Sequence, residues 1–103
     1  MEACALDAVG PRAFDIVINA TSTSTKGEAL ALGPGIIGEG GFAYDMAYGA
    51  CAKPFVAAAL AAGARASDGL GMLVEQAAES YFLWRGARPE TAALLAQLRA
   101  RFA

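Results

Sequence analysis

The fold is decided at residues 14–20, which read FDIVINA. Apolar and β-branched residues follow one another here, without the polar alternation of a half-exposed strand. Such a run is typical of a strand buried on both faces of a parallel sheet. The hydroxyl-rich stretch TSTSTKGE at residues 21–28 is then expected to be a loop at the carboxyl end of this strand.

Further strands are predicted downstream. Residues 42–48, FAYDMAY, alternate aromatic or apolar residues with small or polar ones and predict a second strand. Residues 36–41 before it are expected to be a turn-rich connector, and residues 29–32 a short helical turn. Residues 64–67 are a candidate for a short third strand.

Helical signals separate and follow these strands. Pro54 favours a helix start, and Gly63 ends that helix after about residue 62. Asp68 is expected to cap a second helix that runs through Trp84 to Gly86. Its predicted buried face consists of Leu70, Leu73, Val74, Ala77, Ala78, Tyr81 and Trp84.

A last helix is predicted from Pro89 and Glu90 to Phe102, with Ala93, Leu94 and Leu98 on its apolar face. Arg99 and Arg101 near its end complement the helix dipole. The alternation of strands and helices predicts an α/β domain with a parallel sheet.

Composition excludes several classes of protein. The 103 residues are 56% hydrophobic and 17% charged, which disfavours intrinsic disorder. The net charge is −2 and the basic residues are scattered, so we expect no nucleic-acid partner. No apolar run approaches the length of a membrane span, and the N-terminus has no basic region typical of a secretory signal.

The cysteine and histidine counts limit the chemistry. Two unclustered cysteines, Cys4 and Cys51, indicate reduced thiols in the cytoplasm and not a disulfide scaffold. The chain has no histidine, which excludes a Ser-His-Asp triad within it and disfavours a zinc site. We therefore expect no bound metal.

Three motifs fall where an open parallel sheet binds ligands, at the carboxyl ends of strands. They are residues 19–22 (NATS), 44–48 (YDMAY) and 68–73 (DGLGML), with Gln76 one turn later. Each also has a purely structural interpretation. The first motif is an ordinary strand-end turn, the second places an aromatic residue at the surface edge and a methionine in the core, and the third is a helix cap. Gln76 is expected on an apolar helix face, where a buried amide needs a partner.

Read together, the segments FDIVINATS (14–22), YDMAY (44–48), KPF (53–55) and DGLGMLVEQAAESYFLWRG (68–86) resemble shikimate dehydrogenase. The resemblance runs from about Asp15 to Arg101, and DGLGMLVEQAA is its most specific part. It implies a partial Rossmann-like parallel sheet with flanking helices. It also implies a cytoplasmic oxidoreductase that reduces 3-dehydroshikimate to shikimate with NADPH in aromatic amino-acid biosynthesis.

The resemblance assigns expected roles to seven residues. Thr21 and Ser22 resemble residues on the nicotinamide-ribose side of NADP. Met46 would border the nicotinamide, the Gly69 backbone would approach its amide, and Met72 would pack on its ring. The substrate-binding residues would be Tyr48 and Gln76, whose hydroxyl and amide suit a polyol.

The sequence also departs from the family pattern. Residues 23–26 read TSTK where the family more often has a small residue and glycine, and Lys53 stands where a threonine is usual. We find no catalytic lysine–aspartate pair in the 103 residues. Residues 38–41 (GEGG) are not the pyrophosphate fingerprint, because in the predicted elements they follow no strand and open no helix.

The expectation is therefore a single domain over residues 1–103, the C-terminal part of an NADP-binding domain, without the substrate domain or the Gly-rich loop. Alone it should be inactive. Its open sheet edge should self-associate or pair with a complementary N-terminal portion. The alternatives are a non-catalytic relative that binds a ligand or partner, and a fragment with no function of its own. The choices between shikimate and quinate and between NADP and NAD stay open from these residues.

Overall fold

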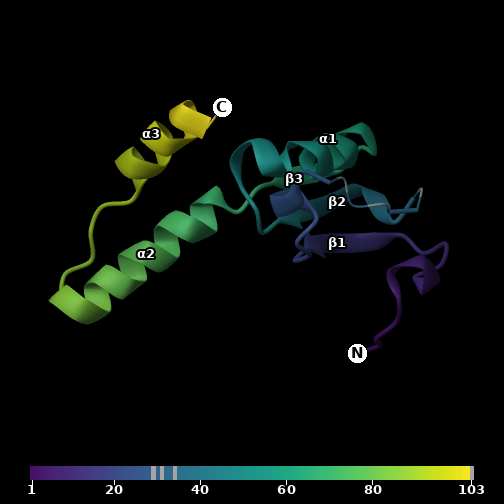
Figure 1. Cartoon of the computed structure of the whole chain (residues 1–103), viewed down its shortest axis with the longest axis horizontal. Coiled ribbons are helices and arrows are strands. Elements are labelled where there is room, and N and C mark those ends of the chain that lie inside the picture. Colours follow the sequence, from purple (N-terminus) through teal and green to yellow (C-terminus); the bar gives the residue numbers. More distant parts are fainter. Residues whose placement is uncertain (29, 31, 34, 103) are drawn as a thin grey trace.

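The computed structural model describes residues 1–28, 30, 32–33 and 35–102. Three strands among these residues form one parallel sheet in the order β1-β2-β3 (Figure 1). They are β1 (Phe14–Asn19), β2 (Ile37–Asp45) and β3 (Arg65–Ser67). The predicted α/β fold with a partial Rossmann-like parallel sheet is confirmed. The predicted turn at residues 29–32 lies partly outside the described residues.

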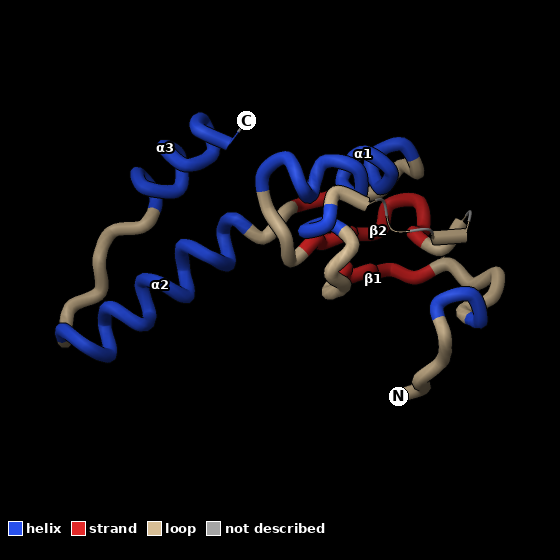
Figure 2. The backbone as a smooth tube through the Cα atoms, in the orientation of Figure 1, coloured by secondary structure: helices blue, strands red, loops and turns tan. Residues whose placement is uncertain are grey.

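Helices flank this sheet unevenly. Helix α1 (Lys53–Ala61) lies against one face, whereas α2 (Leu70–Arg85) and α3 (Ala92–Phe102) form a hairpin that extends away from the sheet (Figure 2). Short 3-10 turns lie before β1 at Leu6–Ala8 (η1), between β1 and β2 at Ser24–Lys26 (η2), and directly before α1 at Gly49–Ala52 (η3). The predicted first two helices agree within a residue or two, but the last begins at Ala92 and not at Pro89.

The second strand differs from its prediction. It covers Ile37–Asp45 instead of residues 42–48, so most of the predicted connector at residues 36–41 is strand. Phe14 pairs with Ile37 and Ile16 with Phe42, so β2 bulges between these pairs. Glycines were read as turn signals here, yet Gly41 is needed within the sheet. A Cβ on Gly41 would lie 2.9 Å from the Asp15 carbonyl oxygen.

The core is small and lies between the sheet and α1. Two large side chains, Ile37 and Phe55, are buried there, and partly buried residues from β1, β3 and the loop before β2 pack against them. The other buried members are alanines, at positions 43, 59 and 64. Each alanine removes little apolar area from water, so this core is small for the length of the chain.

The opposite face of the sheet is uncovered. Ile16 and Ile18 of β1 are 64% and 59% exposed, and their parallel partners on β2 are Phe42 and Tyr44. The prediction that β1 is buried on both faces is therefore wrong for these residues. A run of β-branched residues indicates a doubly covered strand, but a second covering layer is not present among the described residues.

Helix α2 is buried only over its first half. Leu70, Val74 and Ala78 are buried, whereas Tyr81 and Trp84 are exposed, because the helix runs on past the end of the sheet. The predicted buried face is therefore wrong at Ala77, Tyr81 and Trp84, all of which are exposed. Beyond the sheet, hydrogen bonds to Glu79 and Glu75 raise the pKa of Arg88.

Candidate functional site

A buried polar network joins the carboxyl ends of β1 and β2. Asn19 and Asp45, the last residues of the two strands, are 1% and 0% exposed, and Ser24 of η2 is buried beside them. The Asn19 amide donates to Ser24 Oγ over 3.1 Å and to Asp45 Oδ2 over 3.2 Å. The Ser24 hydroxyl donates to the same Asp45 oxygen over 2.7 Å. Buried polar groups must be paired, and this cluster is mutually paired.

The same network shapes both loops that carry predicted site residues. The Thr21 N–H and hydroxyl donate to Asn19 Oδ1 over 3.1 and 2.7 Å. The Met46 N–H donates to the Asn19 carbonyl over 3.0 Å, and the Ala47 N–H donates to Asp45 Oδ1 over 2.9 Å. In the part of the chain that the structure describes, no buried side-chain polar atom lacks a partner. The two strand ends thus form one rigid unit.

Gly69 packs directly on the second of these loops. Its N–H donates to the Ala47 carbonyl over 2.8 Å. A Cβ at this position would lie 2.2 Å from the Met46 carbonyl oxygen, a distance that no side chain tolerates. Glycine is therefore required for close approach of two backbones, although its φ of −83° is open to any residue. Met46 and Gly69, predicted for one site, are in contact.

Tyr48 and its neighbour Gly49 are held from the other side, by Asp68 and by α3. Asp68 was expected to cap α2; the cap position is Gly69, one residue later, yet Asp68 Oδ1 still accepts the Leu70 N–H over 3.2 Å. Asp68 Oδ2 accepts the Gly49 N–H over 3.3 Å. Arg99 of α3 forms an ion pair with Asp68.

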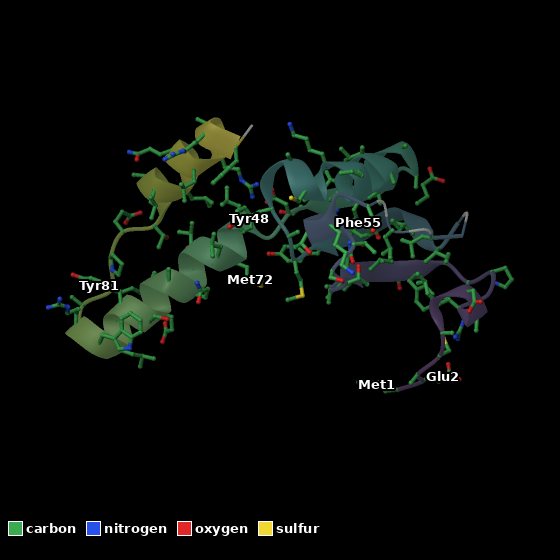
Figure 3. All side chains as sticks on the ribbon, viewed as in Figure 1. Met1, Glu2, Tyr48, Phe55, Met72 and Tyr81 are labelled. Atoms are coloured by element: carbon green, nitrogen blue, oxygen red, sulfur yellow. The ribbon has the colours of Figure 1, made fainter. Side chains whose placement is uncertain are left out.

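The structure brings some of the predicted site residues together and leaves others apart. Contacts connect Thr21, Met46 and Gly69 through the network described above. The side chains of Met46, Tyr48 and Met72 are 44%, 39% and 42% exposed, so each has surface to offer a ligand (Figure 3). The remaining two predicted residues, Ser22 and Gln76, are exposed, and among the described residues no hydrogen bond or ion pair joins their side chains to this group.

The expectation for Gln76 is wrong in one respect. Its side chain is exposed and not buried, and its Nε2 donates to the Leu73 carbonyl of its own helix over 3.2 Å. An apolar helix face was expected to be covered at this point, but Gln76 lies on an uncovered side of α2, although Val74 and Ala78 before and after it are buried. The physical argument for a hidden partner therefore fails, and the role of Gln76 stays a prediction from resemblance.

Sequence reasoning missed the buried residues Asn19, Ser24 and Asp45 and gave Arg99 only a helix-dipole role. A signal was present for two of them, since Asn19 and Asp45 are polar residues that close apolar strands. Nothing local marks Ser24 or Arg99, because each acquires its partner from a distant part of the chain.

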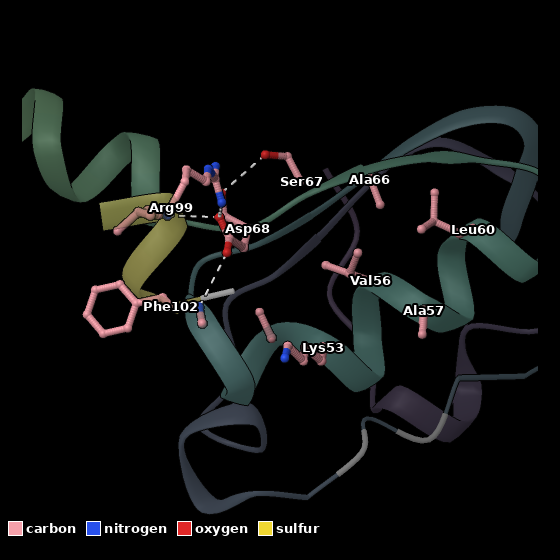
Figure 4. A pocket seen from close by; sticks show the side chains of 12 residues that line it. Lys53, Val56, Ala57, Leu60, Ala66, Ser67, Asp68, Arg99 and Phe102 are labelled. Atoms are coloured by element: carbon pink, nitrogen blue, oxygen red, sulfur yellow. Dashed lines mark hydrogen bonds and ion pairs between the residues drawn. The ribbon is translucent and has the colours of Figure 1, made fainter. Parts of the chain in front are cut away.

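Among the described residues, two of the cavities lie beside α1, and the first borders the Tyr48 loop through Gly49 and Asp68. The larger, about 670 Å³, opens between α1, β3 and α3 and is walled by Val56, Leu60 and Leu70 with Lys53 and Arg99 at its polar side (Figure 4). The smaller, about 230 Å³, lies beside Phe55 and Pro54. None of the seven predicted site residues lines either cavity. The strand-end cluster is the better candidate site, because its polar groups converge there.

Comparison with known proteins agrees with this geometry. Residues 69–99 match the profile of the shikimate 5'-dehydrogenase C-terminal domain. Over 100 residues the chain is 55% identical to the shikimate dehydrogenase (NADP(+)) of Aromatoleum aromaticum, an alignment that covers 96% of this chain and 36% of that protein. The corresponding protein of Dechloromonas aromatica is 58% identical over 91 residues, or 87% of this chain and 33% of the relative.

The chain belongs to the shikimate dehydrogenase family. Among solved structures, the crystal structure of an Ael1 enzyme from Pseudomonas putida matches with a TM-score of 0.79 and 47% identity, over 90% of this chain and 35% of that one. The chain thus spans about a third of the length of the relatives it matches. No helix in the described ranges is long and apolar enough to cross a membrane.

Proposed function

We propose that this chain forms the nicotinamide side and part of the substrate side of an NADP-dependent shikimate dehydrogenase, which reduces 3-dehydroshikimate to shikimate. The observation that supports this most is the joining of the two strand ends and the start of α2. Thr21, Met46 and Gly69 come from three separate segments, yet hydrogen bonds and close backbone packing connect them. A hydride transfer needs this kind of rigid floor under a flat ring.

The residues at this edge suit a nicotinamide. Gly69 is buried, and because it has no Cβ the Met46 carbonyl can pack directly on it, which brings the start of α2 against the strand-end loop. The thioether side chains of Met46 and Met72 are flexible and polarisable, and both are about half exposed, so they can cover an aromatic ring. We assign Thr21 and Ser22 to the ribose side. When bound, NADPH supplies the hydride; the chain holds its ring in place.

On the substrate side we assign Tyr48 and Gln76. A polyol is recognised by hydroxyl and amide groups held at fixed points. The Tyr48 ring packs edge-on against Phe102, with ring centroids 5.7 Å apart. This contact holds the apolar part of the side chain, and the hydroxyl is the group that can bind a polar ligand. Gln76 is exposed, and its amide donates to a backbone carbonyl of its own helix in contact with solvent, so it can turn to a ligand.

We assign no catalytic residue within these 103 residues. We propose that the chain acts as a C-terminal part of an NADP-binding domain, in the cytoplasm, and that alone it does not turn over substrate. Its free, exposed cysteines, Cys4 and Cys51, fit a reducing compartment. The uncovered face around Ile16 and Ile18 fits a chain that pairs with a complementary portion or with itself.

Complementation tests this proposal. The purified chain is mixed with the part of the Aromatoleum aromaticum relative that it does not match, and NADPH consumption with 3-dehydroshikimate is followed. We expect no rate from either piece and a rate from the mixture. Gln76→Ala should raise the KM for substrate at least about tenfold, the cost of losing one hydrogen bond to a polar substrate. Gln97→Ala, an equally exposed glutamine on α3, should not.

Two other outcomes argue against the proposal. A clear NADP-dependent rate from the chain alone would contradict the absence of a catalytic residue. Shikimate binding by the chain together with no activity in any mixture would favour a non-catalytic ligand-binding module instead.

A further inference from the structure

The loop that carries Tyr48 is anchored by residues far along the chain. Tyr48 directly precedes η3 in extended backbone conformation, and its own side chain makes no capping bond there. The next residue, Gly49, has a φ of +66°, which only glycine adopts without strain. Such a loop needs outside contacts to hold one conformation.

Asp68 provides the first contact. One of its carboxylate oxygens accepts the Gly49 N–H and the other accepts the Leu70 N–H, so it ties the Tyr48 loop to the start of α2. A carboxylate that accepts backbone N–H groups makes stronger bonds than a neutral acceptor does. Its orientation therefore determines where Gly49 lies.

Arg99 fixes that orientation from α3. It pairs with Asp68 Oδ1, and the Asp68 side chain is 14% exposed whereas that of Arg99 is 45% exposed (Figure 4). Three residues later on the same helix, Phe102 meets the Tyr48 ring edge-on. A Cβ on Gly49 would also lie 3.7 Å from the Phe102 ring. One face of α3 thus contacts both the Tyr48 ring and the backbone of the loop at Gly49.

We propose that Arg99 is a positioning residue for Tyr48: through Asp68 it holds the Gly49 backbone and seats α3, so that the Tyr48 ring keeps one orientation. That this orientation serves substrate binding rests on the function proposed above. The positioning itself does not depend on it, because it can be measured without any ligand.

The test uses nuclear magnetic resonance on the full 103-residue chain. Arg99→Met should speed hydrogen exchange at the Gly49 amide by about tenfold, the size of one lost charge-assisted contact. It should also move the Tyr48 ring signals towards their positions in Phe102→Leu, where the edge-on ring current is gone. Arg99→Lys keeps the charge and should restore most of both signals. Arg101→Met removes a charge from the same helix turn and should change neither.

Two results would overturn the proposal. The first is an Arg99→Met chain whose Gly49 exchange and Tyr48 signals match those of the wild type. The second is an Arg99→Lys chain that behaves like Arg99→Met while far-ultraviolet circular dichroism shows intact helices. If Arg99→Met loses helix content, Asp68→Asn decides instead: it removes the ion pair but keeps an acceptor, and unchanged Tyr48 signals would then refute the role of Arg99.

A shikimate titration of the same samples separates this proposal from the proposed function. If the wild type binds shikimate, Arg99→Met should weaken binding more than Arg101→Met does. If the wild type does not bind, the substrate-side assignment is in question, whereas the exchange and ring signals still decide the role of Arg99.

Discussion

Replacing Gly69 with alanine should disrupt the junction between α2 and the second strand end. The added Cβ would lie 2.2 Å from the Met46 carbonyl oxygen, 2.8 Å from the Met46 carbonyl carbon and 3.2 Å from the Ala47 carbonyl oxygen. All three neighbours are backbone atoms, which cannot rotate away as a side chain would. The loop or the helix must therefore move by about an ångström to restore ordinary contact distances.

Three terms contribute to the change in the free energy of unfolding. Forcing extra volume into a packed site costs about 1–3 kcal/mol. Weakening the 2.8 Å hydrogen bond from the Gly69 N–H to Ala47 costs about 1 kcal/mol. Alanine restricts the unfolded chain and returns about 0.4–1 kcal/mol, because the φ of −83° at Gly69 suits alanine. The net destabilisation is about 1–3.5 kcal/mol.

The assay is urea unfolding followed by circular dichroism, with Gly71→Ala as the matched control. Gly71 lies two residues later, within α2, and a Cβ there meets nothing within 4 Å. Alanine at Gly71 should therefore stabilise the chain by up to about 1 kcal/mol, through helix propensity. The two glycine-to-alanine changes thus have opposite expected signs. In a thermal melt, Gly69→Ala should lower the Tm by roughly 4 °C or more.

A Gly69→Ala chain within about 0.5 kcal/mol of the wild type, the usual scatter of neutral surface changes, would refute this reasoning. It would mean that the Met46 loop moves away with little loss of free energy of unfolding. The strand end would then not be rigid enough to hold a nicotinamide ring in place.

Further predictions concern the buried network and the open face. Asp45→Ala should lower the free energy of unfolding by about 2–4 kcal/mol, because it leaves the buried donors of Asn19 and Ser24 without this acceptor. Asp15→Ala, at an exposed position of β1, should change it by less than about 0.5 kcal/mol, and urea unfolding of both variants measures the difference. Light scattering on the wild-type chain at ~100 µM should show self-association, because open sheet edges and exposed apolar faces pair at such concentrations. Ile18→Lys places a charge on the uncovered sheet face and should shift that chain towards monomer, and an unchanged mass would argue that association uses another surface.

Local order was largely predictable from the sequence. The apolar run at residues 14–19 is a strand, Pro54 and Gly63 bracket α1, and Gly86 ends α2 with a φ of +73°. These features depend on neighbouring residues and on backbone sterics, which a sequence displays directly. The family resemblance pointed to Thr21, Met46 and Gly69, and hydrogen bonds and backbone packing connect these three residues in the structure. Their ligand-binding roles stay predictions.

Burial was the weaker part of the prediction. Ile16, Ile18, Tyr81 and Trp84 look like core residues by pattern, yet they are exposed in this structure. A hydrophobic pattern says that a side chain is suited to being covered, and only the arrangement of elements says whether anything covers it. The bulged start of β2 was missed for a related reason, because its glycines serve close backbone packing and not a turn.

The sequence by itself determined the parallel α/β organisation, the family and the residue types at the strand ends, because short-range sterics and hydrophobic periodicity are local properties. The tertiary structure alone decided the pairing of Asn19 with Asp45, the contact of Gly69 with Met46, and the reach of Arg99 to Asp68. Each of these joins residues more than 20 positions apart. Their partners are set by how the chain closes on itself, and no pattern of adjacent residues encodes that distance.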